Sequence, residues 1–287
     1  MSGPRVAVVT VSYGSESVLG PFLDSVRTAS ADPSGVVVVV ADNKPVSPSP
    51  VEEIAAGHSA TYLPLPSNRG YGGGMNAAVA ALPPGVEWVL VSNPDIVLEP
   101  GSLDQLVAAG EASHDIGAVG PRVMTDGAVY PSARAIPSVV TGAGHALLSR
   151  VWPGNPWTRA YRRDTSTEPV ARDAGWLSGS CQLVRRTAFD AIGGFDESYF
   201  MYFEDVDLGH RLGRAGWRNR YEPSAIVAHS GAHSTEGESV AMLRAHHESA
   251  YRFMAARYPS WWQWPLRAAL KAGLSLRLAV ESRRATR

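Results

Sequence analysis

The sequence predicts an α/β protein with a mostly parallel central sheet flanked by helices. Short apolar, β-branched runs alternate with segments in which apolar residues recur at helical spacing. Such alternation indicates βαβ units, and therefore parallel strands. Two of the apolar runs lead directly into an aspartate, and a glycine-rich stretch lies between them.

Composition and charge limit the class of protein. The chain has 287 residues, 45% of them hydrophobic and 18% charged, which is enough for a sizeable core in one large domain or two small ones. A net charge of −1 gives no case for nucleic acid. The single cysteine, Cys181, excludes an intrachain disulfide and fits a reducing compartment. The N-terminus does not resemble a signal peptide, and no apolar run approaches the ~18 residues of a spanning helix, so we expect a cytoplasmic protein.

The first predicted elements alternate strand, helix and strand. Arg5–Val11 is an apolar, β-branched run typical of a buried parallel strand. The pure valine run Val36–Val40 predicts a second central strand. Between them, a helix is expected over Ser15–Thr28, where apolar residues recur at Val18, Leu19, Phe22, Leu23 and Val26.

Two further strands complete the regular half of the chain. A proline-rich loop, Pro45–Pro50, and a short helical piece precede the predicted strand Thr61–Leu65. Glycines open a predicted helix over Gly70–Leu82, and the strand Glu87–Ser92 follows. These elements predict a sheet whose carboxyl edge carries the polar residues that follow each strand.

The pattern is looser after Pro100. We expect a helix over Leu103–Ala109, a strand near Gly117–Gly120, and a strand followed by a helix from Gly175 to the C-cap glycines Gly193 and Gly194. The segment 121–168, rich in proline, glycine and tryptophan, has no assignment.

The last third predicts a helix over Glu204–Ala215, closed by Gly216. Two short strands, Trp217–Tyr221 and Ala225–His229, follow it. From residue 239 onward we expect two helices, interrupted at Pro259 and Pro265.

Polar residues at the strand ends point to a nucleotide site. Asp42 and Asp95 follow two strands, and ligands of open α/β sheets bind at this edge. The turn Asn68–Gly74 between them offers backbone N–H groups and the cation Arg69 to a diphosphate, with the base near Asp42. Asp95 suits Mg²⁺ or Mn²⁺. The simpler alternatives are a turn aspartate and a flexible glycine loop.

A competing motif occupies the same glycines. Gly72-x-Gly74-x-x-Ala77 matches the dinucleotide-binding pattern, with Asp95 about 20 residues further on. That motif should follow the first strand directly, whereas here it follows two strands and a proline-containing loop. The match alone is therefore weak evidence for an oxidoreductase.

A second acidic group follows an aromatic stretch, Tyr199–Phe203. Glu204, Asp205 and Asp207 open a helix, where a single acid would suffice to stabilise the helix dipole. Burial by aromatics raises the pKa of a carboxylate, and a helix N-terminus or nearby cations lower it, so the balance stays open. Such a group can be a general base for a hydroxyl. His229, with His233 behind it, is either structural or a metal ligand.

Taken together, these motifs resemble the family 2 glycosyltransferases of the GT-A fold, which has a Rossmann-like sheet. The resemblance runs from about Arg5 to Ser234, and its order and spacing carry it. It includes ADN at 41–43, NRGYGGGMN at 68–76, NPD at 93–95, GWLSGSCQLVRR at 175–186 and GGFDESYFMYFEDVDLGHRL at 193–212. YPSAR at 130–134 and NPW at 155–157 bring it closer to actinobacterial rhamnosyltransferases that act on polyprenyl-diphosphate-linked N-acetylglucosamine.

The resemblance implies a role for each matching residue. Asp205 would be the catalytic base, and Asp95 and His229 would bind Mg²⁺ or Mn²⁺. The nucleotide of a dTDP-sugar donor would contact Thr10, Tyr13, Asp42, Asn68, Arg69, Gly70 and Asn93. The region of the acceptor and the donor sugar would include Trp176, Gly179, Ser180 and Glu204. The implied domains are a catalytic domain at 1–238, with a nucleotide-sugar half at 1–98 and an acceptor half at 99–238, and C-terminal helices at 239–287.

One departure concerns the metal. The first acid of the family's DxD motif is Asn93 here, and an amide lacks the charge of a carboxylate. Metal binding would therefore depend more on Asp95, His229 and the diphosphate. The implied reaction is a single inverting displacement, which needs no activated serine or cysteine, so Cys181 is expected to be a packing residue.

The C-terminal tail suggests a membrane surface. Leu266, Leu270, Leu274 and Leu278 recur every four residues, and the tail is rich in arginine and carries Trp261, Trp262 and Trp264. A basic amphipathic helix with such tryptophans is typical of a protein lying on an anionic membrane, here the inner face of the cell membrane. The alternative is a helix packed on the catalytic domain or on a second subunit of a homodimer.

The sequence thus favours an inverting glycosyltransferase that moves L-rhamnose from dTDP-rhamnose to a lipid-linked N-acetylglucosamine diphosphate. Another nucleotide-sugar donor, a dinucleotide-dependent oxidoreductase and a catalytically silent sugar-nucleotide binder are the alternatives.

Overall fold

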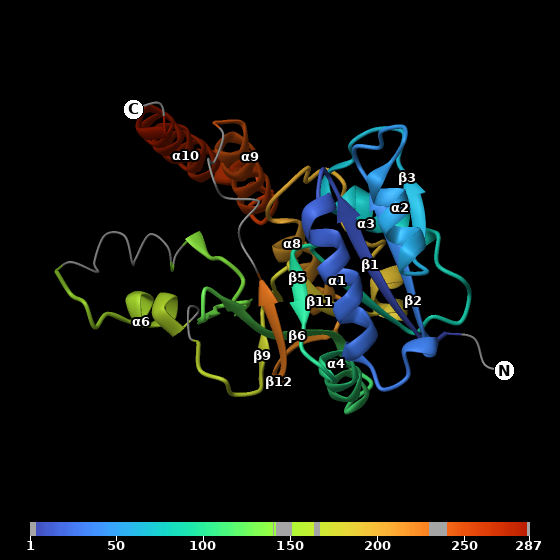
Figure 1. Cartoon of the computed structure of the whole chain (residues 1–287). Helices are drawn as coiled ribbons and strands as arrows, with labels where there is room; N and C mark the ends of the chain where they lie inside the picture. The colour runs from blue at the N-terminus through green and yellow to red at the C-terminus, as the bar shows by residue number, and fades with distance from the viewer. Residues whose placement is uncertain (1–3, 140, 142–150, 164–166, 230–239, 286–287) are drawn as a thin grey trace.

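A computed structural model describes residues 4–139, 141, 151–163, 167–229 and 240–285. Its centre is a ten-stranded sheet with the order β3-β2-β1-β4-β11-β6-β12-β5, in which β7 pairs with β6 and β9 with β12 (Figure 1). A two-stranded ribbon of β8 and β10 lies beside it. The strands are β1 (Val6–Ser12), β2 (Val36–Asp42), β3 (Thr61–Pro64), β4 (Trp88–Ser92), β5 (Ile96–Leu98), β6 (Ile116–Thr125), β7 (Ala128–Tyr130), β8 (Ala133–Arg134), β9 (Arg172–Ala174), β10 (Trp176–Leu177), β11 (Cys181–Arg185) and β12 (Arg218–His229).

The first four strands are parallel, as predicted. β1 lies between β2 and β4, and its end is in register with theirs, with Ser12 opposite Asp42 and Thr10 opposite Ser92. Helices cover both faces, so residues such as Val8 and Val9 are both fully buried although they point in opposite directions. This explains why these strands are continuous apolar runs.

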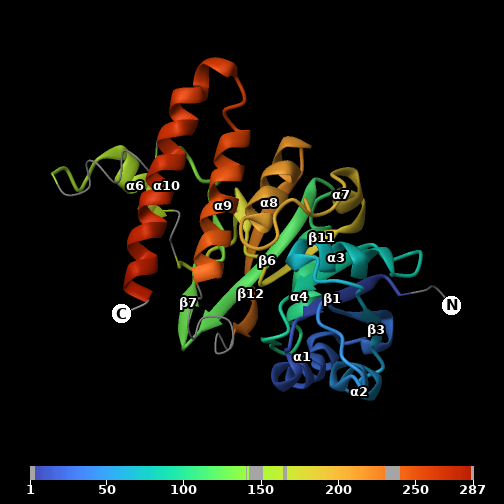
Figure 2. The ribbon, with the colours of Figure 1, turned by 90° about the horizontal axis from the view of Figure 1, so that it is seen from above.

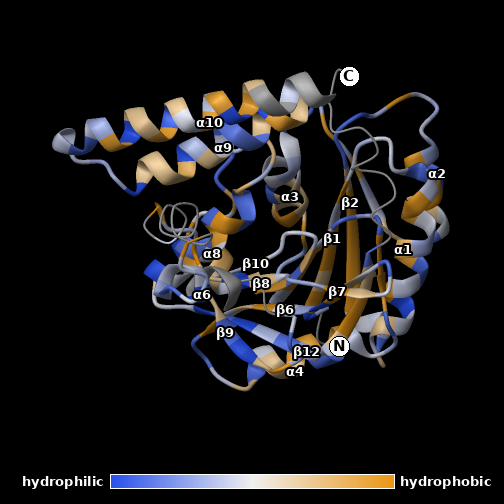
Figure 3. Cartoon of the chain, turned by 90° about the vertical axis from the view of Figure 1, so that its left-hand side faces the viewer, coloured by the Kyte–Doolittle hydropathy of each residue, from blue (hydrophilic) through white to orange (hydrophobic). Residues whose placement is uncertain are grey.

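The helices form a layer on each side of the sheet. In Figure 3, α1 and α2 cover one side of β1 and β2, while α3 and α8 lie on the other. The helices are α1 (Glu16–Ala29), α2 (Pro50–Gly57), α3 (Gly70–Ala80), α4 (Ser102–Glu111), α6 (Pro156–Arg163), α7 (Arg186–Ala191), α8 (Glu204–Arg214), α9 (Val240–Ala256) and α10 (Trp264–Ala285), with 3₁₀ turns at Pro33–Gly35 and Trp261–Gln263.

The second half of the sheet differs from the expectation. The strands β5 and β9 were not expected, and the strand expected from Gly175 is divided by a turn into β10 and β11. The two strands predicted around residues 217–229 are a single irregular strand, β12, whose register against β6 shifts between Glu222 and Ile226. Pro223 interrupts the apolar pattern there, which is why the sequence suggests two strands. β11 runs antiparallel to β4, so it begins at the edge where β4 ends.

The unassigned segment 121–168 supplies the rest of β6 and the short elements β7, β8 and α6. Residues 140, 142–150 and 164–166 of this segment lie outside the described part of the chain.

Two C-terminal helices, α9 and α10, form an antiparallel hairpin beside α8 (Figure 2). Pro265 does not interrupt a helix as expected, because it lies in the first turn of α10, where its missing N–H costs no hydrogen bond. The leucine stripe of α10 is half-buried, while Trp261, Trp262 and Trp264 are 82%, 63% and 61% exposed. Within the described residues, no helix is long and apolar enough to cross a membrane. The expected boundary at residue 238 falls in 230–239, outside the described residues.

Candidate active site

The predicted acids meet along one edge of the sheet. Asp42 ends β2, Asp95 follows β4, and the start of β11 lies beside them because Cys181 pairs with Ser92. The backbone N–H of Asn93 donates to the carbonyl of Ser180 (2.9 Å), which fixes the segment before β11 against the NPD turn. This edge is where open α/β sheets bind ligands.

Asp42 is held rigidly at this edge. It is almost fully buried, and its carboxylate accepts hydrogen bonds from the backbone N–H of Lys44 (2.9 Å) and the hydroxyl of Tyr62 (3.1 Å). Thr10 is fully buried in β1, whereas Tyr13 is exposed, with the Lys44 ammonium 5.5 Å from its ring centroid. Tyr13 and Lys44 therefore lie on the surface next to the buried acid.

The glycine turn is a packed structure rather than a flexible loop. Asn43 clamps it, accepting from the N–H of Arg69 (3.1 Å) and donating to the carbonyl of Gly70 (2.9 Å). Asn68 accepts from the N–H of Gly70 (2.9 Å). The Arg69 guanidinium forms an ion pair with Glu197 (2.7 Å) across the turn, so its charge is partly neutralised.

Close backbone approach explains the glycine at position 70. Its φ is +70°, and an added Cβ would lie 2.1 Å from the carbonyl oxygen of Phe200. Gly72 and Gly74 lie inside α3 and are buried against Phe195 and Val11. These glycines follow β3 rather than the first strand, so their context does not match a dinucleotide-binding motif.

Asp95 and His229 come together from distant parts of the chain. β5 pairs with β12, and the imidazole Nε2 of His229 lies 3.1 Å from Oδ2 of Asp95. Asp95 is 8% exposed. Carboxylate and imidazole both suit Mn²⁺, and Mg²⁺ commonly uses one or two carboxylates plus phosphate oxygens and water. Within the described residues, no group of three or more candidate ligands occurs, and His233 lies outside them.

Asp205 is placed at the N-terminus of α8 by an unusual turn. Tyr202 and Phe203 both have φ of +66°, a conformation that is strained for aromatic residues. The Asp205 carboxylate accepts from the N–H of Gly179 (2.9 Å) and from that of Val206 (2.8 Å). Burial raises the pKa of Asp205, and the hydrogen bonds from Gly179 and Val206 oppose the rise.

Glu204 is a second buried acid beside Asp205. It is 8% exposed, and its Oε2 has no hydrogen-bond partner within the described chain. Burial, followed by the charge of Asp205, raises the pKa of Glu204 to about 8. The sequence left open whether burial, or the helix N-terminus and nearby cations, has the larger effect on the pKa of these acids. For Glu204 and Asp205, burial has the larger effect.

Side chains of α9 contact the strained turn at Tyr202 and Phe203. The Ser249 hydroxyl donates to the carbonyl of Met201 (2.9 Å), and the His246 ring contacts those of Tyr202 and Phe203 edge-on, with centroids 5.3 and 5.7 Å apart. The C-terminal hairpin thus helps to hold the conformation that presents Glu204 and Asp205.

Tyr71 connects α3 to the segment that holds Asp205. Its hydroxyl donates to the carbonyl of Gly179. Burial raises the pKa of the Tyr71 phenol well above its usual value, and the charges of Glu204, Asp205 and Asp95 raise it further. Tyr71 and Asp205 therefore bind the same residue, Gly179, through its carbonyl and its N–H, and the sequence did not single out Tyr71.

The segment from Trp176 to Ser180 connects the site residues that were predicted there. Trp176 packs on α8 at Gly209, Gly179 contacts Asp205, and Ser180 contacts Asn93. Cys181 is buried, and burial raises the pKa of its thiol to about 12, consistent with a packing residue.

Arg134 is a second residue that sequence analysis missed. Its guanidinium lies 5.6 Å from the ring centroid of Trp176, which packs on α8, and its positive charge opposes the rise in the Asp205 pKa. YPSAR, which contains it, was the available signal, but it lies in the segment without assigned structure.

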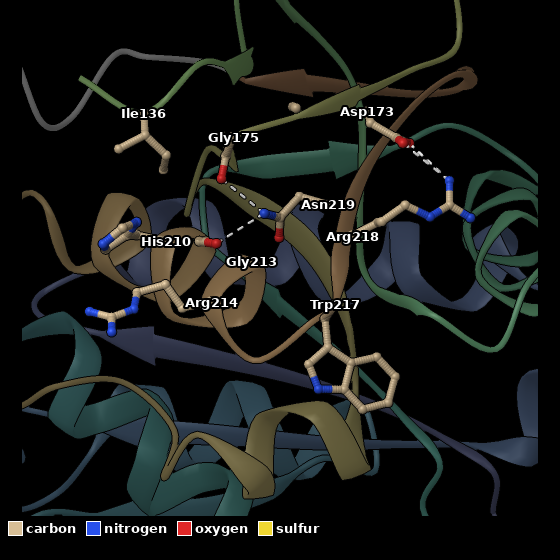
Figure 4. A pocket seen from close by; sticks show the side chains of 11 residues that line it. Ile136, Asp173, Gly175, His210, Gly213, Arg214, Trp217, Arg218 and Asn219 are labelled. Atoms are coloured by element: carbon tan, nitrogen blue, oxygen red, sulfur yellow. Dashed lines mark hydrogen bonds and ion pairs between the residues drawn. The ribbon is translucent and has the colours of Figure 1, made fainter. Parts of the chain in front are cut away.

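The cavity in Figure 4 lies on another side of α8. Its volume is about 290 Å³, and His210, Arg214, Trp217 and Asn219 help to line it. Neither Asp95, Glu204 nor Asp205 lines it, so it is separate from the acidic site.

Comparisons with known proteins identify the family of the chain. The family model described as "Glycosyltransferase like family 2" matches residues 4–247. The N-acetylglucosaminyl-diphospho-decaprenol L-rhamnosyltransferase of Mycobacterium tuberculosis is 47% identical over 280 residues, covering 94% of this chain and 90% of that protein. Rhamnosyltransferase WbbL of Escherichia coli is 25% identical, covering 88% and 93%.

Solved structures show the same fold at low identity. A mannosyltransferase from Pyrobaculum calidifontis, solved with GDP-Man and Mn²⁺, matches with a TM-score of 0.59 and 17% identity, covering 99% of this chain and 81% of that one. GalNAc-T7, solved with UDP, GalNAc and Mn²⁺, matches with a TM-score of 0.58 and 14% identity, covering 79% and 43%. The predicted GT-A fold is confirmed.

The raised pKa of Glu204 predicts how stability depends on pH. An acid whose pKa is raised from 4.5 to about 8 on folding contributes stability below pH 4.5 that is lost as the pH rises through 8. Relative to Glu204→Gln, the wild type should lose roughly 1 kcal/mol per pH unit between pH 5 and 8. Thermal unfolding of both proteins across this range measures the difference.

Glu197→Gln is the control, because the Arg69 guanidinium lowers the pKa of Glu197. The difference in stability between wild type and Glu197→Gln should not change between pH 5 and 8. A Tm difference between wild type and Glu204→Gln that stays constant with pH would contradict the prediction.

Proposed function

The chain belongs to the family 2-like glycosyltransferases, and on that premise we propose that it transfers L-rhamnose from dTDP-rhamnose to a polyprenyl-diphosphate-linked N-acetylglucosamine. The observation that carries the proposal is that adjacent residues of one segment contact both acidic motifs, since the N–H of Gly179 donates to Asp205 and the carbonyl of Ser180 accepts from Asn93 of the NPD turn. The choice of rhamnose and of a lipid-linked acceptor is supported by the 47% identity to the mycobacterial rhamnosyltransferase.

Asp205 is the general base of the proposed reaction. Its backbone hydrogen bonds from Gly179 and Val206 orient the carboxylate, and burial raises its pKa, which strengthens it as a proton acceptor. It removes the proton from the acceptor hydroxyl as that oxygen attacks the anomeric carbon. The bond from that carbon to the nucleotide diphosphate breaks in the same step, so the configuration inverts.

The donor nucleotide lies along the edge formed by Asp42, the Asn68–Gly70 turn and Asn93. Asp42 is fixed by Lys44 and Tyr62, which suits a rigid contact to the base, and Tyr13 offers an exposed ring beside it. Thr10 supports this edge from within β1. Trp176, Gly179, Ser180 and Glu204 border the region of the two sugars.

Asp95 and His229 would hold Mg²⁺ or Mn²⁺. When bound, the ion neutralises charge on the departing diphosphate. Asn93 adds no charge to the set, so these two side chains and the diphosphate itself carry the metal affinity.

The tip of the C-terminal hairpin would lie on the membrane that carries the acceptor. Trp261, Trp262 and Trp264 are exposed there, and Arg267 and Lys271 follow on α10. Exposed tryptophans with nearby cations favour the interface of an anionic membrane, which supports a peripheral location on the cytoplasmic face.

Asp205→Asn tests the base. It should lower kcat for rhamnosyl transfer by about 10²- to 10⁴-fold, because the amide accepts no proton, while dTDP binding stays unchanged. The assay is the mass of the disaccharide formed from dTDP-rhamnose and a short-chain N-acetylglucosamine diphosphate lipid, with UDP- and GDP-sugars as competing donors. Full activity of the variant would contradict the base assignment, and a wild type that transfers another sugar would contradict the donor.

Chelation tests the metal. EDTA should weaken dTDP-rhamnose binding at least about tenfold, and Mn²⁺ should restore it, because a diphosphate needs its charge neutralised. Asp95→Asn and His229→Ala should not respond to added Mn²⁺, whereas His114→Ala, an exposed histidine elsewhere, should respond like the wild type. Calorimetry gives the affinities. Binding that is equal with and without metal would argue against the site.

Vesicle co-sedimentation tests the membrane surface. The wild type should bind vesicles containing anionic phospholipid and lose binding in high salt, because the attraction is partly electrostatic. Trp261→Ser with Trp262→Ser should reduce binding severalfold, whereas Trp152→Ser, which alters an exposed tryptophan elsewhere, should not. Equal binding by all three proteins would exclude the hairpin tip as the contact.

A further inference from the structure

Arg134 is a cation held in place by aromatic rings. It lies on β8, directly opposite Trp176 of β10 in the two-stranded ribbon. Its guanidinium carbon is 5.3 Å from the ring centroid of Tyr130 and 5.6 Å from that of Trp176, and its Nε donates to the carbonyl of Pro131 (2.7 Å). The Trp176 indole is itself fixed by a hydrogen bond to the carbonyl of Ala135 (3.1 Å).

Its guanidinium is available to a ligand. Among the described residues, no carboxylate forms an ion pair with Arg134, in contrast to Arg69, Arg211 and Arg218, which are paired. Nε is the only part of the guanidinium group for which a hydrogen bond to the described chain is found. The two terminal nitrogens therefore keep their donors, and the stacked rings reduce the entropy lost when they bind.

Arg134 and the NPD turn contact opposite ends of the segment 176–180, which also holds Asp205. Along the segment from 176 to 180, Trp176 contacts Arg134, Gly179 contacts Asp205, and Ser180 contacts Asn93. Four residue steps at about 3.3 Å each give this segment a length of at most about 13 Å. The donor diphosphate belongs at the end near Asn93 and Asp95, so the cation at the other end faces a different group.

The proposed acceptor contains an anionic group that Arg134 can bind. The acceptor carries a diphosphate that is separated from its reacting hydroxyl by one sugar ring. With the hydroxyl at Asp205, the diphosphate must lie a short distance away, on the side opposite the donor. A guanidinium group matches phosphate oxygens with paired N–H donors better than an ammonium group does.

We propose that Arg134, held between Tyr130 and Trp176, binds the diphosphate of the lipid-linked acceptor and selects acceptors that carry one. This rests on the proposed function. Trp176 then acts mainly by positioning Arg134, and the sugar ring lies between Arg134 and Asp205.

Paired acceptors test the proposal. The first is the short-chain N-acetylglucosamine diphosphate lipid, and the second is a neutral alkyl N-acetylglucosaminide of similar chain length. Arg134→Gln should lower kcat/KM for the diphosphate acceptor by roughly 10- to 100-fold, the effect of losing a charged hydrogen bond. It should leave kcat/KM for the neutral acceptor almost unchanged. Arg134→Lys should restore part of the loss.

Arg172→Gln is the matched control. Arg172 also stacks on an aromatic ring, that of Tyr221 at 4.6 Å, and donates to the same ribbon at Ala133 (3.1 Å). Its loss should affect both acceptors equally. Loss of the Arg134 charge also raises the pKa of Asp205, which changes the rate of transfer without any effect on diphosphate binding. Measuring kcat/KM for both acceptors at several pH values separates the two effects. The effect on the pKa applies to both acceptors alike and fades at high pH.

Three results would overturn the proposal. They are an equal loss for both acceptors at high pH, no loss for the diphosphate acceptor, and weaker dTDP binding by Arg134→Gln, which would assign the cation to the donor.

A binding experiment separates this proposal from the proposed function. Calorimetry with a short-chain polyprenyl diphosphate that lacks a sugar should show binding to the wild type and roughly tenfold or weaker binding to Arg134→Gln. If the wild type transfers no rhamnose yet binds this lipid through Arg134, the proposed function fails and the diphosphate site stands. If transfer occurs but both proteins bind the lipid equally, the site fails alone.

Discussion

The hydrogen bond from the Gly179 N–H to the Asp205 carboxylate connects the central sheet to the start of α8. Gly179 precedes β11, which is in register with β4, whereas Asp205 opens a helix more than twenty residues later. A Cβ at Gly179 would lie 3.2 Å from that of Asp205, so a larger residue would push the acid away. Because the same segment contacts Asn93 at one end and Arg134 at the other, its position affects the spacing of Asp205, Arg134 and the NPD turn.

Burial changes the pKa of the acids in this site. Glu204 and Asp205 are adjacent acids that share a poorly solvated site, and each is harder to ionise for that reason. Asp95 has a different setting, with the His229 imidazole against its carboxylate. The two acidic settings therefore differ, because Asp205 accepts hydrogen bonds from backbone N–H groups whereas Asp95 lies against an imidazole.

The sequence was sufficient for the regular half of the fold and for the acids. Valine runs and helical spacing identify β1, β2 and α1 because burial on both faces leaves an unmistakable pattern. The ribbon of β8 and β10 has two residues in each strand, too few for any periodicity, and tertiary contacts such as its packing on α8 fix it. Arg134 could not be placed for that reason. The ion pair between Arg69 and Glu197 could not be predicted either, since 128 positions separate the two residues.

The packing of α9 on the turn at Tyr202 and Phe203 has a consequence for biosynthesis. That turn has a conformation its own residues disfavour, and Ser249, His246 and Phe253 supply contacts that hold it. These residues leave the ribosome after the whole catalytic sheet has emerged. The sheet can therefore form before the contacts that hold the turn in front of Glu204 and Asp205 are available.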